Sequence, residues 1–147
     1  MTLQDLLATI PYGVWHDVRV DADDGDEVTL RVPFRPELAN YAGTFHAGAL
    51  YTLAETVAGV VADRAVPGER AYVLLRSAQI NYTRRPEGDV IAAARKTETD
   101  AAAALKDFET SGRADIAVDV TMKDSLGESV FAGRFDYALR PRKAGWK

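Results

Sequence analysis

Apolar residues recur at helical spacing through the segment from Asn40 to Arg64. Between Ala47 and Ala62 the apolar positions return every three or four residues, which predicts a helix. Other apolar side chains fill much of the remaining circumference, so we expect the helix to be wrapped on several sides by other elements. Thr44 is the expected N-cap, and Pro67–Gly68 ends the segment. The rest of the chain is organised around this helix.

Alternation of apolar and polar positions predicts strands before and after that helix. An Asp-rich turn joins the first two into an expected hairpin. The expected strands cover residues 14–21, 28–34, 72–82, 89–97, 114–123 and 129–139. Strands on both sides of one apolar helix favour an α+β fold, in which a curved antiparallel sheet wraps around the helix. Such a sheet leaves one face or edge open, so we expect a second copy to cover it.

Two shorter helices are predicted outside this core. Residues 3–10 form an amphipathic segment that Pro11 and Gly13 are expected to end. Residues 101–111 form the second, with a cap at Thr99 or Asp100 and Gly112 as the closing residue. The pattern shows no repeat and no linker, so we expect a single domain.

One acidic residue, Glu55, lies in the middle of the apolar helix. An ionised carboxylate in apolar surroundings requires a hydrogen-bonding partner or a functional role. A structural role would bond it to Thr52, Thr56 or the backbone, whereas a functional role would make it a general base or a nucleophile. The sequence leaves both readings open.

Composition removes several classes of function. The 147 residues are 47% hydrophobic and 27% charged, which is typical of a globular domain that needs no disulfide or metal. A net charge of -4 argues against general affinity for nucleic acid. With no cysteine and two histidines we expect neither a thiolate nucleophile nor a metal site, and no cofactor. The first residues lack a basic region and a long apolar run, so we expect a cytoplasmic protein without signal peptide or membrane span.

A motif at the start of the central helix resembles that of the hotdog-fold thioesterases. The motif is Asn40-x-x-Gly43-Thr44-x-His46-x-Gly48-Ala49-x-x-x-Leu53-x-Glu55. It is most similar to the phenylacetate-type (PaaI-like) acyl-CoA thioesterases and their uncharacterised relatives. Residues 77–82, followed by an Arg-Pro-Glu-Gly-Asp corner, resemble the third strand and turn of that family. The resemblance implies one hotdog domain over residues 1–147, with a core of about 14–139 and a basic tail at 140–147.

The resemblance also implies roles for individual residues. Glu55 stands at the position of the family's catalytic Asp or Glu, a general base or nucleophile. Asn40 matches the asparagine that orients the water or the thioester, and the backbone N–H groups of Ala47 and Gly48 match those that polarise the thioester carbonyl. Ala47 replaces the usual first glycine, which leaves a backbone donor in place. Glu55 replaces the more common Asp, which moves the carboxylate by one methylene.

The spacing of these groups predicts a dimer. Glu55 follows Ala47 by eight residues, which is roughly 12 Å along a helix at 1.5 Å per residue. One helix therefore cannot present both groups to the same carbonyl. Two antiparallel copies can, with Glu55 of one subunit beside the helix start of the other, so we expect a homodimer or a dimer of dimers.

Other residues near this motif are candidates for substrate binding. His46 either contacts the substrate or caps the helix. Ser77 either bonds the water or Glu55, or is a structural strand serine, and Tyr51 is a candidate pocket wall. Arg84 and Arg85 could bind the phosphates of CoA, as could the basic tail, although solvated surface charge is the simpler reading of both.

The main functional hypothesis is therefore hydrolysis of acyl-CoA thioesters to free acid and CoA. An alternative is a non-catalytic hotdog dimer that binds an acyl thioester or another apolar ligand. A less favoured alternative is an enoyl-thioester hydratase, whose histidine lies further upstream of its acidic residue than His46 lies from Glu55.

Overall fold

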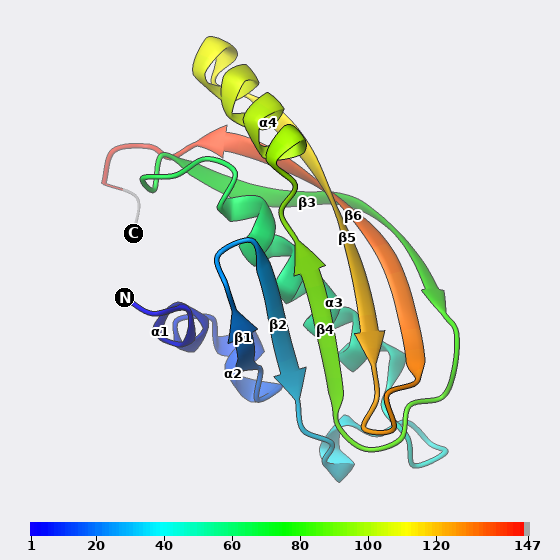
Figure 1. Cartoon of the computed structure of the whole chain (residues 1–147). Helices are drawn as coiled ribbons and strands as arrows, with labels where there is room; N and C mark the ends of the chain where they lie inside the picture. Colours follow the sequence, from blue (N-terminus) through cyan, green and yellow to red (C-terminus); the bar gives the residue numbers. More distant parts are fainter. Residues whose placement is uncertain (146–147) are drawn as a thin grey trace.

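The computed structural model describes residues 1–145, which form four α-helices, one short 3-10 helix and six strands (Figure 1). The strands are β1 (Arg19–Asp23), β2 (Glu27–Val32), β3 (Ala71–Tyr82), β4 (Val90–Arg95), β5 (Ala114–Lys123) and β6 (Ser129–Pro141). The helices are α1 (Leu3–Ala8), α2 (Pro11–Trp15), η1 (Pro36–Leu38), α3 (Ala47–Asp63) and α4 (Glu98–Ser111). None of the described helices is long and apolar enough to cross a membrane.

All six strands join one antiparallel sheet in the order β1-β2-β4-β5-β6-β3. Along β5 every second residue is buried, as expected when one face of a strand packs on a core. The same alternation in β2 and β4 gives the sheet one apolar face. β1 and β3 are the two edges, and the 12-residue β3 has a hydrogen-bonded neighbour on one side only.

Helix α3 lies in the concave face of this sheet (Figure 1). It contacts every strand from β2 to β6. Leu53, Ala54, Val57 and Ala58 are fully buried, and burying a side chain such as Leu or Val contributes about 1.5–3 kcal/mol. The prediction of an α+β fold with a curved sheet around one long helix is confirmed.

One face of α3 is covered only in part by the sheet. Tyr51, Glu55, Gly59 and Asp63 follow one another at intervals of four residues and are all half-buried, unlike the buried residues between them. Residues four apart lie on one side of a helix, so these four form a continuous stripe. We call this stripe, together with Thr56, the open face of α3.

The structure corrects the expected elements near the N-terminus. Residues 14–18, the first part of the expected strand 14–21, do not form a strand: Pro11 begins α2 instead of ending the preceding helix, because proline suits the first position of a helix. The first strand starts only at Arg19. In α1 the sole buried residue is Leu7, so the expected apolar side of residues 3–10 is covered only in part.

Other boundaries also differ from the prediction: β2 ends at Val32 and β4 at Arg95, earlier than the expected strands 28–34 and 89–97. Thr97, not Thr99 or Asp100, caps α4, while Gly112 closes it with a positive φ as expected. The N-cap of α3 is His46 rather than Thr44. β6 continues through residues 140–141, so the tail begins later than predicted; its last two residues, 146–147, lie outside the described part of the chain.

Candidate functional site

Two loops meet at the N-terminal end of α3 and enclose a cavity of about 430 Å³. The first loop precedes the helix and the second, residues 83–88, follows β3. Twelve residues line the cavity: Asn40, Tyr41, Ala42, Thr44, Phe45, Ala47, Leu50, Tyr82, Thr83, Arg84, Arg85 and Pro86. The structure thus brings together Asn40, Ala47, Arg84 and Arg85 of the predicted set.

Asn40 holds the loop before α3 in shape. Its side-chain oxygen accepts the backbone N–H groups of Ala42 (2.9 Å) and Thr44 (3.3 Å). Its amide nitrogen donates a long bond of 3.5 Å to the Phe45 carbonyl. An amide nitrogen carries two N–H groups, and Asn40 is among the residues that line the cavity.

Two backbone donors are exposed where α3 begins. The N–H of Gly48 is bonded to Nδ1 of the His46 ring at 2.8 Å. In the described part of the chain no group accepts the N–H of Ala47. The helix start therefore presents one free donor and one covered by an exposed imidazole. Because Nδ1 accepts this bond, the neutral ring of His46 carries its proton on Nε2.

Glu55 lies outside the cavity, on the open face of α3. The Tyr137 hydroxyl donates to the backbone carbonyl of Glu55 at 2.9 Å and lies 3.3 Å from its carboxylate Oε1. Burial raises the pKa of the Glu55 carboxyl above its usual value, and the Tyr137 hydroxyl opposes that rise. A half-buried carboxyl with a raised pKa is a stronger base than an ordinary carboxylate, which suits it to accept a proton in a reaction.

Tyr51 lies on the open face of α3 with Glu55, and Tyr82 lines the cavity. Tyr51 lies one turn before Glu55 and packs against Phe135. Burial, and secondly the charge of Glu55, raises the pKa of Tyr51. The hydroxyl of Tyr82 donates to the Ala47 carbonyl at 3.1 Å. Tyr51 is not among the residues that line the cavity, so its role as a pocket wall stays a prediction.

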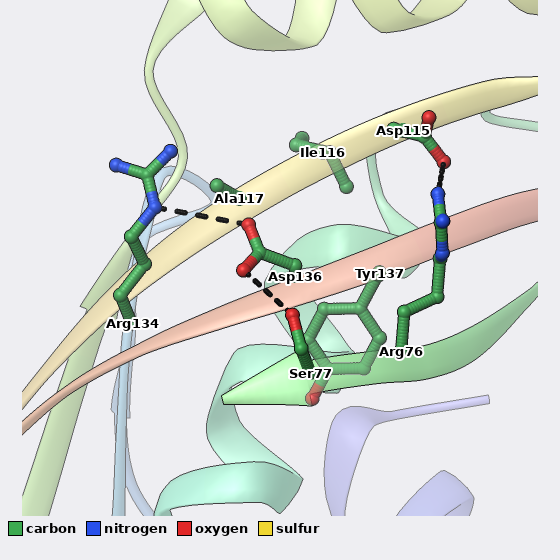
Figure 2. A pocket seen from close by; sticks show the side chains of 8 residues that line it. All are labelled: Arg76, Ser77, Asp115, Ile116, Ala117, Arg134, Asp136 and Tyr137. Atoms are coloured by element: carbon green, nitrogen blue, oxygen red, sulfur yellow. Dashed lines mark hydrogen bonds and ion pairs between the residues drawn. The ribbon is translucent and has the colours of Figure 1, made fainter. Parts of the chain in front are cut away.

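Ser77 does not face Glu55, which favours the structural one of its two predicted roles. A β-bulge between Leu75 and Ser77 resets the register of β3 against β6, and Ser77 then pairs with Asp136. Its hydroxyl donates to Asp136 at 3.0 Å, as Figure 2 shows. The next residue along β6, Tyr137, points the opposite way into the core. Ser77 therefore belongs to the outer face of the sheet.

That outer face carries a depression of about 540 Å³, which is larger than the cavity at the start of α3. Its charged groups are already matched: Arg76 bonds Asp115 at 3.2 Å, and Arg134 lies 3.7 Å from Asp136 (Figure 2). Its described lining includes no helix start, and of its two carboxylate residues Asp115 is exposed and Asp136 is half-buried. The smaller cavity at the start of α3 contains a free backbone donor and two arginines. We therefore take this cavity, together with the open face of α3, as the candidate site.

Tyr137 and Tyr82 were not predicted from the sequence to belong to the site. A signal for Tyr137 was present, because it falls on the inward-facing positions of β6 with Phe131 and Phe135. A tyrosine among core aromatics must place its hydroxyl against a partner, and Glu55 is the polar residue of the facing helix. For Tyr82, which sits at a strand end, we find no comparable signal.

Among the described residues no group of histidine, cysteine or carboxylate side chains is arranged to hold a metal ion. The site offers instead a half-buried carboxylate, a free backbone donor and two arginines. These are the groups that hydrolysis of an ester or thioester requires, namely a base and a donor for the oxyanion. Within one chain the candidate base, Glu55, and the candidate oxyanion donor, the N–H of Ala47, lie at two places along α3.

Comparison with known proteins gives a family and a fold. A family described as a domain of unknown function, DUF4442, matches residues 4–139. Among proteins of curated function none matches the chain significantly. A structure from Pseudomonas aeruginosa, described as a protein of unknown function and "Probable Thioesterase", superposes with a TM-score of 0.84 at 24% identity, covering 95% of this chain and 93% of the other.

Two other solved structures carry the same architecture. A thioesterase from Haemophilus influenzae has a TM-score of 0.75 at 16% identity, covering 99% of this chain and 96% of its own. A Staphylococcus aureus protein, called a thioesterase enzyme in one of its structures, has been solved with a glutamate and, separately, a glutamine replaced by alanine. Its glutamate variant has a TM-score of 0.71 at 17% identity, covering 93% and 99% of the two chains. The hotdog fold is thereby established.

Proposed function

The chain belongs to the DUF4442 family of domains of unknown function, and we propose that this member hydrolyses acyl-CoA thioesters to the free acid and CoA. The observation that carries the proposal is Glu55, a half-buried carboxylate with a raised pKa on the open face of the central helix. It occurs in a fold shared with several proteins named thioesterases.

In the proposed reaction Glu55 acts as the base. It removes a proton from water while the hydroxide adds to the thioester carbonyl, and collapse of the tetrahedral intermediate expels the thiolate, which takes up the proton. Direct attack by the carboxylate, followed by hydrolysis of the anhydride, uses the same residue as nucleophile. In both versions negative charge develops on the carbonyl oxygen and needs a donor.

The helix start of a second subunit supplies that donor. Because Glu55 and Ala47 are roughly 12 Å apart along one helix, the site requires two copies with antiparallel helices. Two features support this dimer: the open face of α3, and the unpaired edge of the long strand β3. Two-fold symmetry then creates two equivalent sites, each built from both chains.

The remaining predicted residues fit around this arrangement. The N–H of Ala47 is free to bind the carbonyl, and that of Gly48 becomes available once the His46 ring moves aside. Asn40 lines the same cavity, and Arg84 and Arg85 form its basic rim. Ser77 has no part in this proposal, since it faces the opposite side of the sheet.

The spacing of Asn40 and Glu55 adds independent support. In the Staphylococcus aureus thioesterase the substituted glutamine and glutamate are separated by the same number of residues as Asn40 and Glu55. An amide side chain and a carboxylate thus recur at one separation in two chains of this fold. This shared spacing supports the proposal that Asn40 and Glu55 belong to one site.

The test is release of free thiol from short-, long- and aryl-chain acyl-CoAs by the wild type and two variants. Glu55→Gln keeps the size of the side chain but removes the base, and we expect a loss of at least about 100-fold in kcat. Asp63→Asn is the matched control: it changes another half-buried carboxyl of the open face whose pKa burial raises. Equal activity of Glu55→Gln and wild type would refute the role of Glu55.

Binding without turnover is the alternative that one observation favours. The Gly48 N–H is already bonded to His46, so a ligand that leaves this bond intact would meet an incomplete oxyanion site. Saturable binding of an acyl-CoA with no thiol release from any chain class would replace the hydrolase proposal. Hydration of an enoyl thioester would revive the hydratase alternative.

A further inference from the structure

The arginine-bearing loop 83–88 is fastened to the rest of the fold by more contacts than a surface turn needs. Both the N–H and the hydroxyl of Thr83 bond strand β6, to the carbonyls of Val130 (3.0 Å) and Ser129 (3.2 Å). At the other end of the loop the Glu87 carbonyl accepts the N–H (3.1 Å) and hydroxyl (2.6 Å) of Ser125. The loop is therefore docked against the turn between β5 and β6.

A single buried carboxylate, Asp124, organises this docking. Its Oδ1 accepts the N–H groups of Leu126 and Glu128 within its own turn, each at 3.0 Å. Its Oδ2 accepts the N–H of Glu87 from the arginine loop, also at 3.0 Å. Burial alone would raise the pKa of the Asp124 carboxyl, but these three backbone donors and Arg84 hold it below its usual value.

The same loop is tied to the start of α3. The hydroxyl of Thr44 donates to the Pro86 carbonyl at 3.0 Å. Thr44 is in the loop that Asn40 shapes, two residues before the helix cap. A continuous set of hydrogen bonds therefore runs from Asp124 through the arginine loop to the helix start. Packing leaves little room for change, because a Cβ on Gly88 would lie 2.4 Å from the Ser125 hydroxyl oxygen.

The loop fastened in this way holds two exposed guanidinium groups at the cavity. Arg84 lies 3.9 Å from Glu128, a weak surface pair. In the described residues Arg85 has no ion-pair partner. Two cations held at a cavity mouth, with at most one loose counter-charge, match a ligand that carries phosphate.

We propose that Asp124 is a positioning residue that holds Arg84 and Arg85 against the phosphates of the thioester's carrier. The inference rests on the proposed function for the identity of the thioester. It goes beyond that function by naming a buried carboxylate, remote from the reacting atoms, that controls recognition of the phosphorylated end. The phosphate belongs either to the nucleotide end of CoA or to a phosphopantetheine arm.

The decisive substitution is Asp124→Asn. The asparagine oxygen can still accept the Leu126 and Glu128 N–H groups, so the turn between β5 and β6 is kept. Its amide nitrogen cannot accept the Glu87 N–H, so only the contact to the arginine loop is lost. Asp119→Asn, the same change at an exposed carboxylate of β5, is the control.

Steady-state kinetics would use one acyl group on three carriers: CoA, phosphopantetheine and pantetheine. We expect Asp124→Asn to raise KM for acyl-CoA about tenfold with kcat unchanged, and to leave KM for acyl-pantetheine unchanged. A higher KM for acyl-CoA but not for acyl-phosphopantetheine assigns the phosphate subsite to the nucleotide end of CoA. A higher KM for both carriers assigns it to the phosphopantetheine arm. Equal effects on all three carriers, or none, would overturn the proposal.

Binding of free CoA and of pantetheine, measured by calorimetry, separates this inference from the proposed function. If no variant hydrolyses a thioester but Asp124→Asn weakens CoA binding about tenfold relative to Asp119→Asn, the inference stands and the hydrolase proposal fails. If the wild type turns over acyl-CoA and Asp124→Asn matches it in KM and CoA affinity, the inference fails and the function stands.

Discussion

The contact between Tyr137 and Glu55 gives a prediction whose size follows from the structure. Tyr137→Phe removes a single hydroxyl from a side chain that is 1% exposed. The single proton of that hydroxyl is shared between a shorter bond of 2.9 Å to the Glu55 carbonyl and a longer one of 3.3 Å to its carboxylate. The ring and its packing remain, so the change isolates those two bonds.

The stability effect comes mainly from the shorter bond. A buried hydrogen bond between neutral groups contributes about 0.5–1.5 kcal/mol. We expect a loss of about 1 kcal/mol in the free energy of unfolding, which lowers Tm by about 2–4 °C for a chain of this size. Thermal unfolding of the two proteins at one pH measures this.

The catalytic effect comes from the longer bond. The hydroxyl favours the ionised carboxylate, so its loss raises the pKa of Glu55 further above its usual value. If ionised Glu55 is the base, the acid limb of the kcat/KM profile moves to higher pH. The variant should lose about fivefold relative to wild type on the acid limb, which corresponds to one hydrogen bond of about 1 kcal/mol, and little on the plateau.

The raised pKa of Glu55 also determines how the stability effect of Tyr137→Phe depends on pH. A carboxyl whose pKa is higher in the folded than in the unfolded chain binds its proton more tightly when folded. Its contribution to stability is fully present below the unfolded pKa and is lost as pH rises through the folded pKa. Tyr137→Phe should therefore lose more stability at neutral than at acid pH.

Thr56→Val is the control for this experiment. It removes a hydroxyl next to Glu55 that bonds the Thr52 carbonyl at 2.6 Å and does not bond the carboxylate. Its acid limb should coincide with that of the wild type. An unmoved acid limb in Tyr137→Phe, with activity reduced equally at all pH values, would refute the link between Tyr137 and the ionisation of Glu55.

Two further predictions concern the dimer and the core. Thr56→Arg places a charged, bulky group on the open face of α3. If that face is the subunit interface, size-exclusion chromatography should show a monomer and thioesterase activity should disappear. An unchanged elution volume with full activity would exclude this interface. In Gly133→Ala the new Cβ would lie 3.0 Å from the rings of Phe131 and Phe135, and overpacking of this kind costs about 1–3 kcal/mol. Denaturant unfolding measures that cost, and a variant as stable as the wild type would show that the two rings can move apart.

The sequence alone determined the elements that depend on local pattern. The apolar period of residues 47–63 predicted α3, and the alternation in residues 114–123 and 129–139 predicted β5 and β6. Gly112 was predicted to close α4 because a left-handed residue is needed there. The isolated carboxylate of Glu55 was visible for the same reason: it interrupts an apolar period.

Tertiary structure decided which side chains meet, because contacts between distant segments leave no periodic signal. Thr44 satisfies local rules for an N-cap, but its hydroxyl bonds Pro86, 42 residues away, and His46 caps the helix instead. A bulge of one residue in β3 turned Ser77 to the outer face, since each such shift reverses the side of a strand's side chains. The partners of Glu55 and of the arginine loop, Tyr137 and Asp124, come from segments brought near only by the sheet.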